Sequence, residues 1–402
     1  MRGSDLRVAL TPVSHPSMPL SAHPTVLLAI SLPCLPASLD CSARPVCLGA
    51  HLCKQDTQGF QANAHGKGHR AIGSLPTAME QSVEPAVVRM SRFAMACNFE
   101  VLLWGRQRDY LEAAAQQALE DVRVLEGQLS AYRLLSEVDQ INAAAASRPV
   151  RVSPQVFGLL EQAIRISTET GGAFDITVGP LVRCWGFYQR SGRVPSAQEM
   201  ETARAVVGYQ HLRLHHESMS VSFDAEGVEI NLGAVGKGYA VDRIVEYLVS
   251  LGIPGALVDA GRSSSYALGT QPAGEAWRLG VEHPLDPDRR VAVLSVSNVG
   301  VSNSGPTQQF FEADGVVYGH IIDPRTGWPA QGILSAVAIA PTAAESDALS
   351  TAFAVMGVEA TRAYCEAHSG VRALLVPRPQ AGDRVAPVAV GLNEQELEWM
   401  VL

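Results

Sequence analysis

One lysine of this 402-residue chain lies in a glycine-rich turn, at Lys237 between Gly236 and Gly238. An alternating run at 228–232 predicts a strand before the turn, and an amphipathic pattern to about residue 251 predicts a helix after it. Only two other lysines occur in the sequence. A strand, a glycine turn and a helix N-terminus in succession favour an anionic ligand, and a compact ammonium suits phosphate. A solvated lysine at a helix start is the alternative interpretation.

This turn matches neither of two common nucleotide-binding patterns. Gly-x-x-x-x-Gly-Lys is absent, and Gly238 stands where a P-loop has the serine or threonine that binds magnesium. Gly-x-Gly-x-x-Gly is absent as well. The turn is therefore a candidate phosphate site of another type, with Lys237 as its charge.

Asp347 and Thr351 are spaced four residues apart in a segment predicted to be helical. Thr342 and Glu345 form a capping-box pattern that predicts the helix start, and the helix is expected to run through Met356. Residues four apart share one helical face, so this carboxylate and hydroxyl would lie together as hard oxygen ligands suited to Mg²⁺. An exposed polar stripe near the helix start is the alternative interpretation.

A third polar group lies in the run Tyr318-Gly-His-Ile-Ile-Asp-Pro-Arg-Thr-Gly327. It combines His320 and Asp323 with an arginine and a threonine, although Asp-Pro alone is ordinary turn chemistry. Together with the lysine turn and the Asp347 pair, this run favours Mg²⁺-assisted chemistry on a phosphate ester, because metal and lysine both neutralise developing negative charge. The sequence holds no nucleophile-elbow serine and no zinc-spaced ligand set.

Composition limits the class of protein. Apolar residues make up 47% of the chain and charged residues 18%, which is typical of a folded protein with a large core. The net charge of -9 argues against non-specific nucleic-acid binding. No apolar run reaches about 18 residues, so no transmembrane segment is predicted.

Residues 1–78 differ from the rest of the chain. They hold four of the seven cysteines and show no helical or strand period, so we expect a disordered extension or translated sequence upstream of the true start. A zinc or disulfide cluster is the alternative, although no Cys-x-x-Cys spacing occurs. Neither a secretory signal nor a lipoprotein cleavage site fits, which slightly favours the cytoplasm. A domain at 79–380 and a C-terminal tail at 381–402 are predicted to follow.

Periodicity and capping patterns predict a mixture of helices and short strands after Met79. Beyond the segments above, helices are predicted at 111–130, at 154–170 after the capping Ser153, at 197–206 after the capping box of Ser196 and Glu199, and up to about 369. Strands are predicted at 99–104, 211–214, 218–223, 256–258, 277–281, 291–296, 299–301, 336–339 and 373–376. This mixture predicts one large α+β domain with mixed sheets and packed helices, and a two-lobed form is the alternative.

Five segments of the chain resemble the ApbE family of FAD:protein FMN transferases. They occur in the family's order with spacings close to its own, and the resemblance covers roughly residues 95–376. The segments are Leu129-Ser-Ala-Tyr-Arg133, Gly171-Gly-Ala-Phe-Asp-Ile-Thr-Val-Gly-Pro-Leu-Val182, Gly233-Ala-Val-Gly-Lys-Gly-Tyr-Ala-Val-Asp242, His320-Ile-Ile-Asp-Pro-Arg-Thr-Gly327 and Ser346-Asp-Ala-Leu-Ser-Thr-Ala352.

The resemblance implies a T-fold-related α+β fold and a specific reaction. A threonine hydroxyl of an acceptor flavoprotein would attack the phosphorus of the FMN half of FAD, AMP would leave, and FMN would become ester-linked to the acceptor. Mg²⁺ would polarise the pyrophosphate and stabilise the leaving phosphate. A Mg²⁺-dependent FAD pyrophosphatase and a non-catalytic FAD-binding protein are the alternatives.

The resemblance also implies roles for individual residues. Its FAD contacts are Met95, Tyr132, Ala173, Phe174, Asp175, Asn231, Lys237 and Ile321, with Tyr132 stacking on an aromatic ring. Its magnesium ligands are the backbone carbonyl of Ala234 with Asp347 and Thr351. Lys237 would neutralise charge on phosphate, and either His320 or Asp323 would act as the general base.

Three sites depart from the family's pattern. At position 231 this chain has asparagine, where the family usually has an aspartate before Leu-Gly. It has Gly261-Arg-Ser263 where the family often has Gly-Gly-Asp, and Ala96-Cys97 where Gly-Thr is usual. A neutral amide can hydrogen-bond but cannot supply negative charge, and Arg262 would either crowd the ligand or add a phosphate contact. No proposed metal ligand is removed, so we expect an active enzyme.

Overall fold

An eight-stranded antiparallel sheet forms the centre of the fold, in a computed structural model that describes residues 84–189, 191–306, 309–380, 382 and 384–400. In spatial order its strands are β1 (Ala86–Ala94), β2 (Cys97–Gly105), β6 (Gly255–Ala260), β7 (Ser264–Gly269), β10 (Val299–Ser304), β13 (Ile333–Ala340), β14 (Arg372–Pro377) and β15 (Val388–Val390). Every residue of β6 and β13 is buried, because other elements cover both faces of the sheet's centre. The predicted extension at 1–78 lies outside the described residues.

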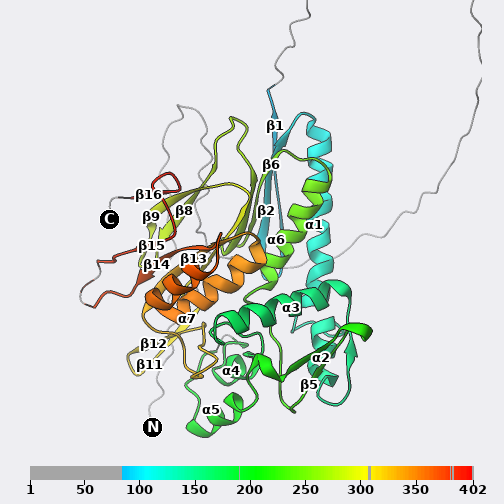
Figure 1. Cartoon of the computed structure of the whole chain (residues 1–402), viewed down its shortest axis with the longest axis vertical. Helices are drawn as coiled ribbons and strands as arrows, with labels where there is room; N and C mark the ends of the chain where they lie inside the picture. The colour runs from blue at the N-terminus through cyan, green and yellow to red at the C-terminus, as the bar shows by residue number, and fades with distance from the viewer. Residues whose placement is uncertain (1–83, 190, 307–308, 381, 383, 401–402) are drawn as a thin grey trace, which may run out of the picture.

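Three long helices pack on one face of this sheet (Figure 1): α1 (Arg108–Leu129), α6 (Gly236–Ser250) and α7 (Ala343–Ala367). Val101, Leu103 and Val258 alternate along their strands and share one hydrophobic cluster with the buried faces of these helices. The two helices predicted in the α7 region are joined, and Gly357, with φ of 77°, interrupts the helical backbone between them.

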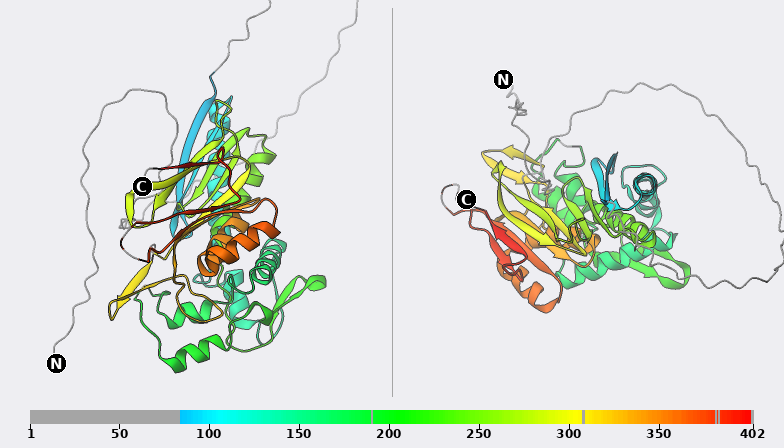
Figure 2. Two further views of the ribbon diagram at one scale, coloured as in Figure 1. Left: turned by 60° about the vertical axis from the view of Figure 1, so that its left-hand side comes forward. Right: turned by 90° about the horizontal axis from the view of Figure 1, so that it is seen from above.

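The opposite face of the large sheet carries a three-stranded sheet made of β16 (Leu397–Trp399), β9 (Asp286–Val296) and β8 (Trp277–His283). Leu102 and Leu257 pack with residues of β8 and β9 in a second hydrophobic cluster. The predicted tail at 381–402 supplies β15, which extends the large sheet, and β16, which pairs with β9. Figure 2 shows these layers from two further directions, with α7 lying against the strands.

A smaller, mainly helical region lies beside one end of the large sheet (Figure 1). Its elements are α2 (Glu137–Ala144), β3 (Val150–Arg151), α3 (Pro154–Glu169), α4 (Gly179–Cys184), α5 (Ala197–Arg204), η1 (Tyr209–His211), β4 (Leu212–His215), η2 (His216–Ser218) and β5 (Ser220–Phe223). The predicted helix starts are confirmed, since Ser153 accepts the Val156 N–H and Ser196 with Glu199 forms a complete capping box. A separate hairpin of β11 (Phe310–Ala313) and β12 (Val316–Gly319) precedes the His320 loop.

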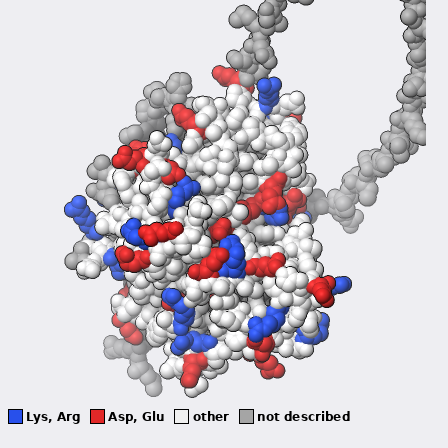
Figure 3. All heavy atoms as spheres, in the orientation of Figure 1, with Lys and Arg blue, Asp and Glu red and all other residues white. Residues whose placement is uncertain are grey.

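The α+β class predicted from the sequence is confirmed by this arrangement of antiparallel sheets and packed helices. No helix in the described ranges is long and apolar enough to span a membrane. On the face drawn in Figure 3, acidic and basic side chains are interspersed, so this face has no broad basic surface.

The strand predicted at 228–232 does not form. In the described chain this segment makes one isolated bridge, between Glu229 and Val178. The side-chain amide of Asn142 bonds both backbone groups of Ile230, because its Oδ1 accepts the N–H at 2.8 Å and its Nδ2 donates to the carbonyl at 2.9 Å. These bonds take the place of a neighbouring strand, so the alternating pattern produces an extended segment instead of a sheet strand.

Candidate active site

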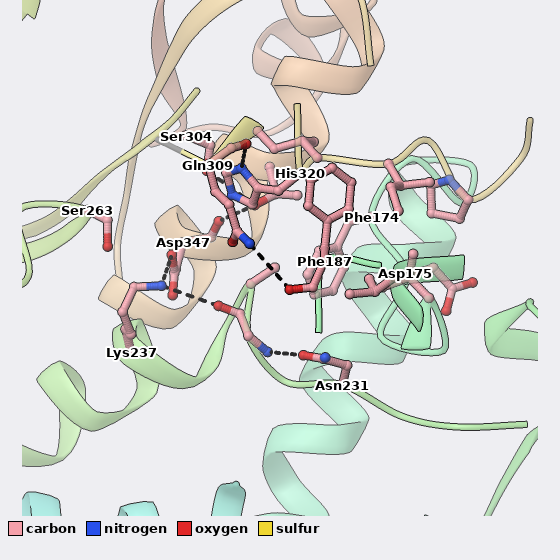
Figure 4. A pocket seen from close by; sticks show the side chains of 18 of the residues that line it. Phe174, Asp175, Phe187, Asn231, Lys237, Ser263, Ser304, Gln309, His320 and Asp347 are labelled. Carbon is pink, nitrogen blue, oxygen red and sulfur yellow. Dashed lines mark hydrogen bonds and ion pairs between the residues drawn. The ribbon is translucent and has the colours of Figure 1, made fainter. Parts of the chain in front are cut away.

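A cavity of about 280 Å³ lies between the glycine turn before α6, the first turns of α7 and the loop after β12 (Figure 4). Its walls include most of the predicted site residues, namely Tyr132, Ala173, Phe174, Asp175, Asn231, Ala234, Lys237, His320, Ile321, Asp347 and Thr351. Figure 4 shows Ser263, Lys237 and Asp347 toward one end and Phe174 and Phe187 toward the other. The cavity therefore suits a ligand with a charged end and a planar aromatic end.

Close contact between α6 and α7 brings Lys237 to Asp347. A Cβ atom on Gly238 would lie 2.2 Å from the carbonyl oxygen of Ala343, so this approach requires glycine. The Gly238 N–H donates to Asp347 Oδ2 at 3.0 Å. Lys237 Nζ donates to the Gly233 carbonyl at 3.2 Å and lies 4.0 Å from Asp347 Oδ1. The ammonium and the buried carboxylate are thus held side by side at the cavity wall.

Asp242 connects α6 to the start of α7 through hydrogen bonds. Its carboxylate, on α6, accepts the N–H groups of Ala343 at 2.7 Å and Ala344 at 2.8 Å, at the start of α7. Burial raises the pKa of Asp242 to about 6, while the two N–H groups act in the opposite direction. The bond to Ala343 spans 101 positions in the sequence, so it joins segments that meet only in the complete fold.

The three predicted magnesium ligands present a suitable set of oxygen atoms. Gly238 lies in the first turn of α6, where backbone N–H groups have no partner within the helix, and its N–H donates to Asp347. Ala234 precedes the N-cap Val235 and lines the cavity. Thr351 Oγ1 lies 3.2 Å from Ser304 Oγ at the same wall. Among the described residues no three His, Cys, Asp or Glu side chains cluster as a metal site. One carboxylate with a hydroxyl and a carbonyl still fits Mg²⁺, which commonly takes its other ligands from phosphate and water.

His320 is oriented by the residue that precedes β11. Its backbone N–H donates to the Gln309 carbonyl at 3.0 Å, and its Nδ1 lies 3.2 Å from the same oxygen. A carbonyl oxygen only accepts, so Nδ1 carries the proton and Nε2 carries the lone pair. Burial lowers the pKa of His320, the Gln309 bond opposes this shift and the Lys237 charge adds to it. The imidazole is therefore neutral near pH 7 and able to accept a proton.

Asp323 has a different environment from His320, although both were candidate bases. Its Oδ1 accepts from Arg325 Nε at 2.9 Å and its Oδ2 accepts from Arg325 Nη2 at 2.9 Å. The Arg325 backbone N–H adds a third bond at 3.0 Å. Asp323 does not line the cavity. The Asp323 carboxylate therefore stabilises its own loop, and of the two candidate bases only His320 lines the cavity.

Asp175 lines the cavity, but its oxygen atoms are engaged by the protein. Oδ1 accepts from the Thr177 N–H at 2.8 Å and its hydroxyl at 2.7 Å, and Oδ2 accepts from the Tyr209 N–H at 2.7 Å. Burial is the largest cause of its raised pKa. Met95 lies outside the cavity lining, in the tight β1–β2 turn with φ of 48°, and its N–H donates to Glu126 at 2.8 Å.

Several lining residues were missed by sequence reasoning, namely Phe187, Ser263, Asn303, Ser304 and Gln309. Asn303 and Ser304 follow apolar residues at the end of β10, and that change from apolar to polar was a usable signal. Gln309 carried no such signal. Among the positions that depart from the family's pattern, Asn231 and Ser263 line the cavity. Arg262 does not; its N–H donates to Asp259 at 3.0 Å from a left-handed conformation with φ of 61°.

Comparison with known proteins gives one consistent family. A model described as the ApbE family matches residues 95–375. A FAD:protein FMN transferase from Vibrio cholerae is 35% identical over 262 residues, which cover 64% of this chain and 77% of that protein. The protein of the same name from Escherichia coli K12 is 35% identical over 237 residues, covering 58% and 67%. A crystal structure of an ApbE protein from Thermotoga maritima matches with a TM-score of 0.69 and 30% identity, covering 76% of this chain and 97% of that one.

Proposed function

The chain belongs to the ApbE family, and on that premise we propose that it is a Mg²⁺-dependent FAD:protein FMN transferase. It would move FMN from FAD to a threonine hydroxyl of an acceptor flavoprotein and release AMP. The observation that carries this proposal is the placement of Lys237, Asp347 and His320 around one cavity. Relatives whose names state the FMN transferase activity support the same reaction.

The polar end of the cavity would receive the pyrophosphate of FAD. Lys237 Nζ would bind a phosphate oxygen there and offset the negative charge that develops in the transition state. Asp347, Thr351 and the Ala234 carbonyl would hold Mg²⁺, which supplies Lewis-acid polarisation of the pyrophosphate when bound. Ser263 and Ser304 line the same end and offer hydroxyl donors to further oxygen atoms.

His320 would act as the general base. Its Nε2 would take the proton of the threonine hydroxyl while the threonine oxygen bonds to the phosphorus of the FMN half. The bond from that phosphorus to the bridging oxygen breaks, and AMP leaves with the electron pair. The Gln309 carbonyl, which accepts from Nδ1, orients the ring and stabilises the imidazolium that forms.

The experiment that tests this proposal supplies full-length protein with FAD and Mg²⁺, with and without an acceptor domain that carries a threonine acceptor site. AMP and the mass of the acceptor are followed together. AMP with a gain of one FMN on the acceptor supports transfer. AMP with free FMN and an unchanged acceptor indicates a pyrophosphatase. Stoichiometric FAD that remains intact with several acceptors indicates a binding protein, and either result contradicts the proposal.

Matched variants assign the activity to this cavity. Lys237→Ala and Asp347→Ala should each lower AMP release by about 100-fold or more, because Lys237 would offset the charge of the transition state and Asp347 would hold the Mg²⁺ that does the same. Arg123→Ala is the control, since Arg123 pairs with Glu120 on the exposed surface of α1. EDTA should abolish AMP release and added Mg²⁺ should restore it. Near-normal rates in both cavity variants would contradict the assignment of the site.

A further inference from the structure

Tyr132, the residue expected to stack on the flavin, is held by a second aromatic ring. The residue is 66% exposed, and its ring lies 5.0 Å from that of Tyr188, measured between centroids, at an interplanar angle of 55°. The guanidinium carbon of Arg183 lies 4.8 Å from the centroid of the Tyr188 ring. The position of Tyr188 therefore limits where the exposed ring of Tyr132 can lie.

The Tyr188 hydroxyl lies in the middle of a directional chain of hydrogen bonds. The Gly233 N–H donates to Asn231 Oδ1 at 2.8 Å, which fixes the amide so that Nδ2 faces Tyr188 as a donor. Asn231 Nδ2 then donates to the Tyr188 hydroxyl at 3.0 Å. The hydroxyl donates to Glu229 Oε1 at 2.8 Å, and Arg183 Nη2 donates to both Glu229 oxygens at 2.7 and 2.9 Å. In these bonds no donor faces another donor and no acceptor faces another acceptor.

We propose that Tyr188 is a positioning residue for Tyr132, and that Asn231 sets the direction of the hydrogen bonds that hold Tyr188. This inference rests on the proposed function for the identity of the ligand as a flavin. An aspartate at 231 only accepts at neutral pH, and the single Tyr188 proton cannot serve carboxylates at both 229 and 231. Asn231 is thus matched to Tyr188 and Glu229 in this chain, although aspartate is the family's usual residue at 231.

The protonation state of Tyr188 supports this role. Burial, followed by the charge of Glu229, raises the pKa of Tyr188, so the hydroxyl keeps the proton that it donates. The other charged and titratable groups around position 231 are Glu229, Arg183 and Tyr132 in the network and Lys237, Asp347, His320 and Asp175 in the cavity. These groups are present in the wild type and in every variant, so each variant is compared with the wild type at the same pH.

The test compares Asn231→Asp, Tyr188→Phe and the double variant in the full-length chain. FAD binding is measured by calorimetry in EDTA so that turnover does not interfere. At about pH 8, Asn231→Asp should weaken FAD binding about tenfold, because one of two carboxylates loses its donor. The carboxylates at 229 and 231 repel each other, so the pair takes up its first proton at a higher pH than an isolated aspartate does. As the pH is lowered to about 5, this proton restores a donor to the network, so the loss should shrink to about twofold. In the Tyr188→Phe background the same substitution should cost less than about threefold, because the hydroxyl is gone.

Tyr110→Phe is the matched control. Its hydroxyl donates to the Leu251 carbonyl at 3.0 Å and Tyr110 does not line the cavity, so its loss should leave FAD affinity unchanged. Wild-type affinity in Asn231→Asp at the higher pH would overturn the positioning role. A loss that is equal at both pH values, or that persists in the Tyr188→Phe background, would overturn it as well.

Denaturant unfolding of the ligand-free variants separates this inference from the proposed function. The pH-dependent coupling between positions 188 and 231 should appear in the unfolding midpoint without any flavin. Coupling in the midpoint with unchanged FAD affinity would establish the hydrogen bonds and refute the positioning role. If the wild type fails to bind FAD, the proposed function fails and the positioning role falls with it, while the midpoints still report on the hydrogen-bond chain.

Discussion

Replacement of Gly238 by alanine tests how the α6–α7 contact positions the candidate site. An added Cβ would lie 2.2 Å from the Ala343 carbonyl oxygen and 2.8 Å from Ala344 Cα. To reach ordinary contact distance, the start of α7 must move by about 1 Å relative to α6. The same movement stretches the 3.0 Å bond between the Gly238 N–H and Asp347 beyond hydrogen-bond range.

The expected loss of stability follows from the steric overlap and from the lost hydrogen bond. Overpacking costs about 1–3 kcal/mol, and loss of a hydrogen bond to a buried carboxylate adds about 1.5–3 kcal/mol. The higher helix propensity of alanine returns about 1 kcal/mol. We therefore expect the free energy of unfolding to fall by about 3 kcal/mol. Because Asp347 moves with α7, a displacement of about 1 Å should also lower the rate of AMP release about 100-fold.

Gly236→Ala provides a matched control on the same helix. The nearest atom to its added Cβ would be Leu232 Cβ at 3.9 Å, which is an ordinary contact, and Gly236 does not line the cavity. This variant should be as stable as the wild type, or more stable by up to about 1 kcal/mol, with an unchanged rate. Urea unfolding and AMP release measured on both variants make the comparison. If Gly238→Ala behaves like Gly236→Ala in both assays, the close approach of the helices does not position Asp347.

Three further substitutions give separate tests. His320→Gln should lower the rate of FMN transfer about 100-fold or more and remove the acidic limb of the pH–rate profile. Because burial lowers the pKa of His320 from 6.5, the wild-type rate should remain constant as the pH falls through 6.5 and decrease only at lower pH, where the imidazole takes up a proton. A midpoint above pH 6.5 would contradict the role of His320 as the base. Asp323→Asn should retain the acidic limb, since its carboxylate bonds Arg325 outside the cavity, and disappearance of the limb would identify Asp323 as the base. Arg262→Gly should raise the free energy of unfolding by about 1 kcal/mol in urea, because glycine adopts a positive φ without strain. A lower midpoint would show that the arginine side chain stabilises the fold.

Local signals in the sequence were sufficient for several elements of the fold and for part of the site. The starts of α3 and α5 were predictable because capping depends on residues three positions apart, such as Ser196 and Glu199. The shared face of Asp347 and Thr351 was predictable from helical spacing, and both line the cavity. Lys237 was predictable from its glycine turn.

Bonds between distant segments account for what the sequence did not reveal. The amide of Asn142 replaces a strand partner for Ile230 across 88 positions, and no local pattern contains that information. Asp323 looked as suitable a base as His320, because composition does not show whether a carboxylate faces a cavity or bonds its own loop. Tyr188 carried no sequence signal, since its importance comes from Asn231 and Glu229, which are 43 and 41 positions away.

The bonds from Asp242 to the start of α7 affect when the ligand site can first exist during synthesis. The N–H groups that this carboxylate accepts come 101 and 102 residues later in the chain. At about 5–20 residues per second, a ribosome needs roughly 5–20 s to supply them after α6 has been made. Throughout that interval Asp347 has not been made, and during most of it the His320 loop has not been made either. At the proposed site we therefore expect a nascent chain to bind FAD only after α7 has been completed.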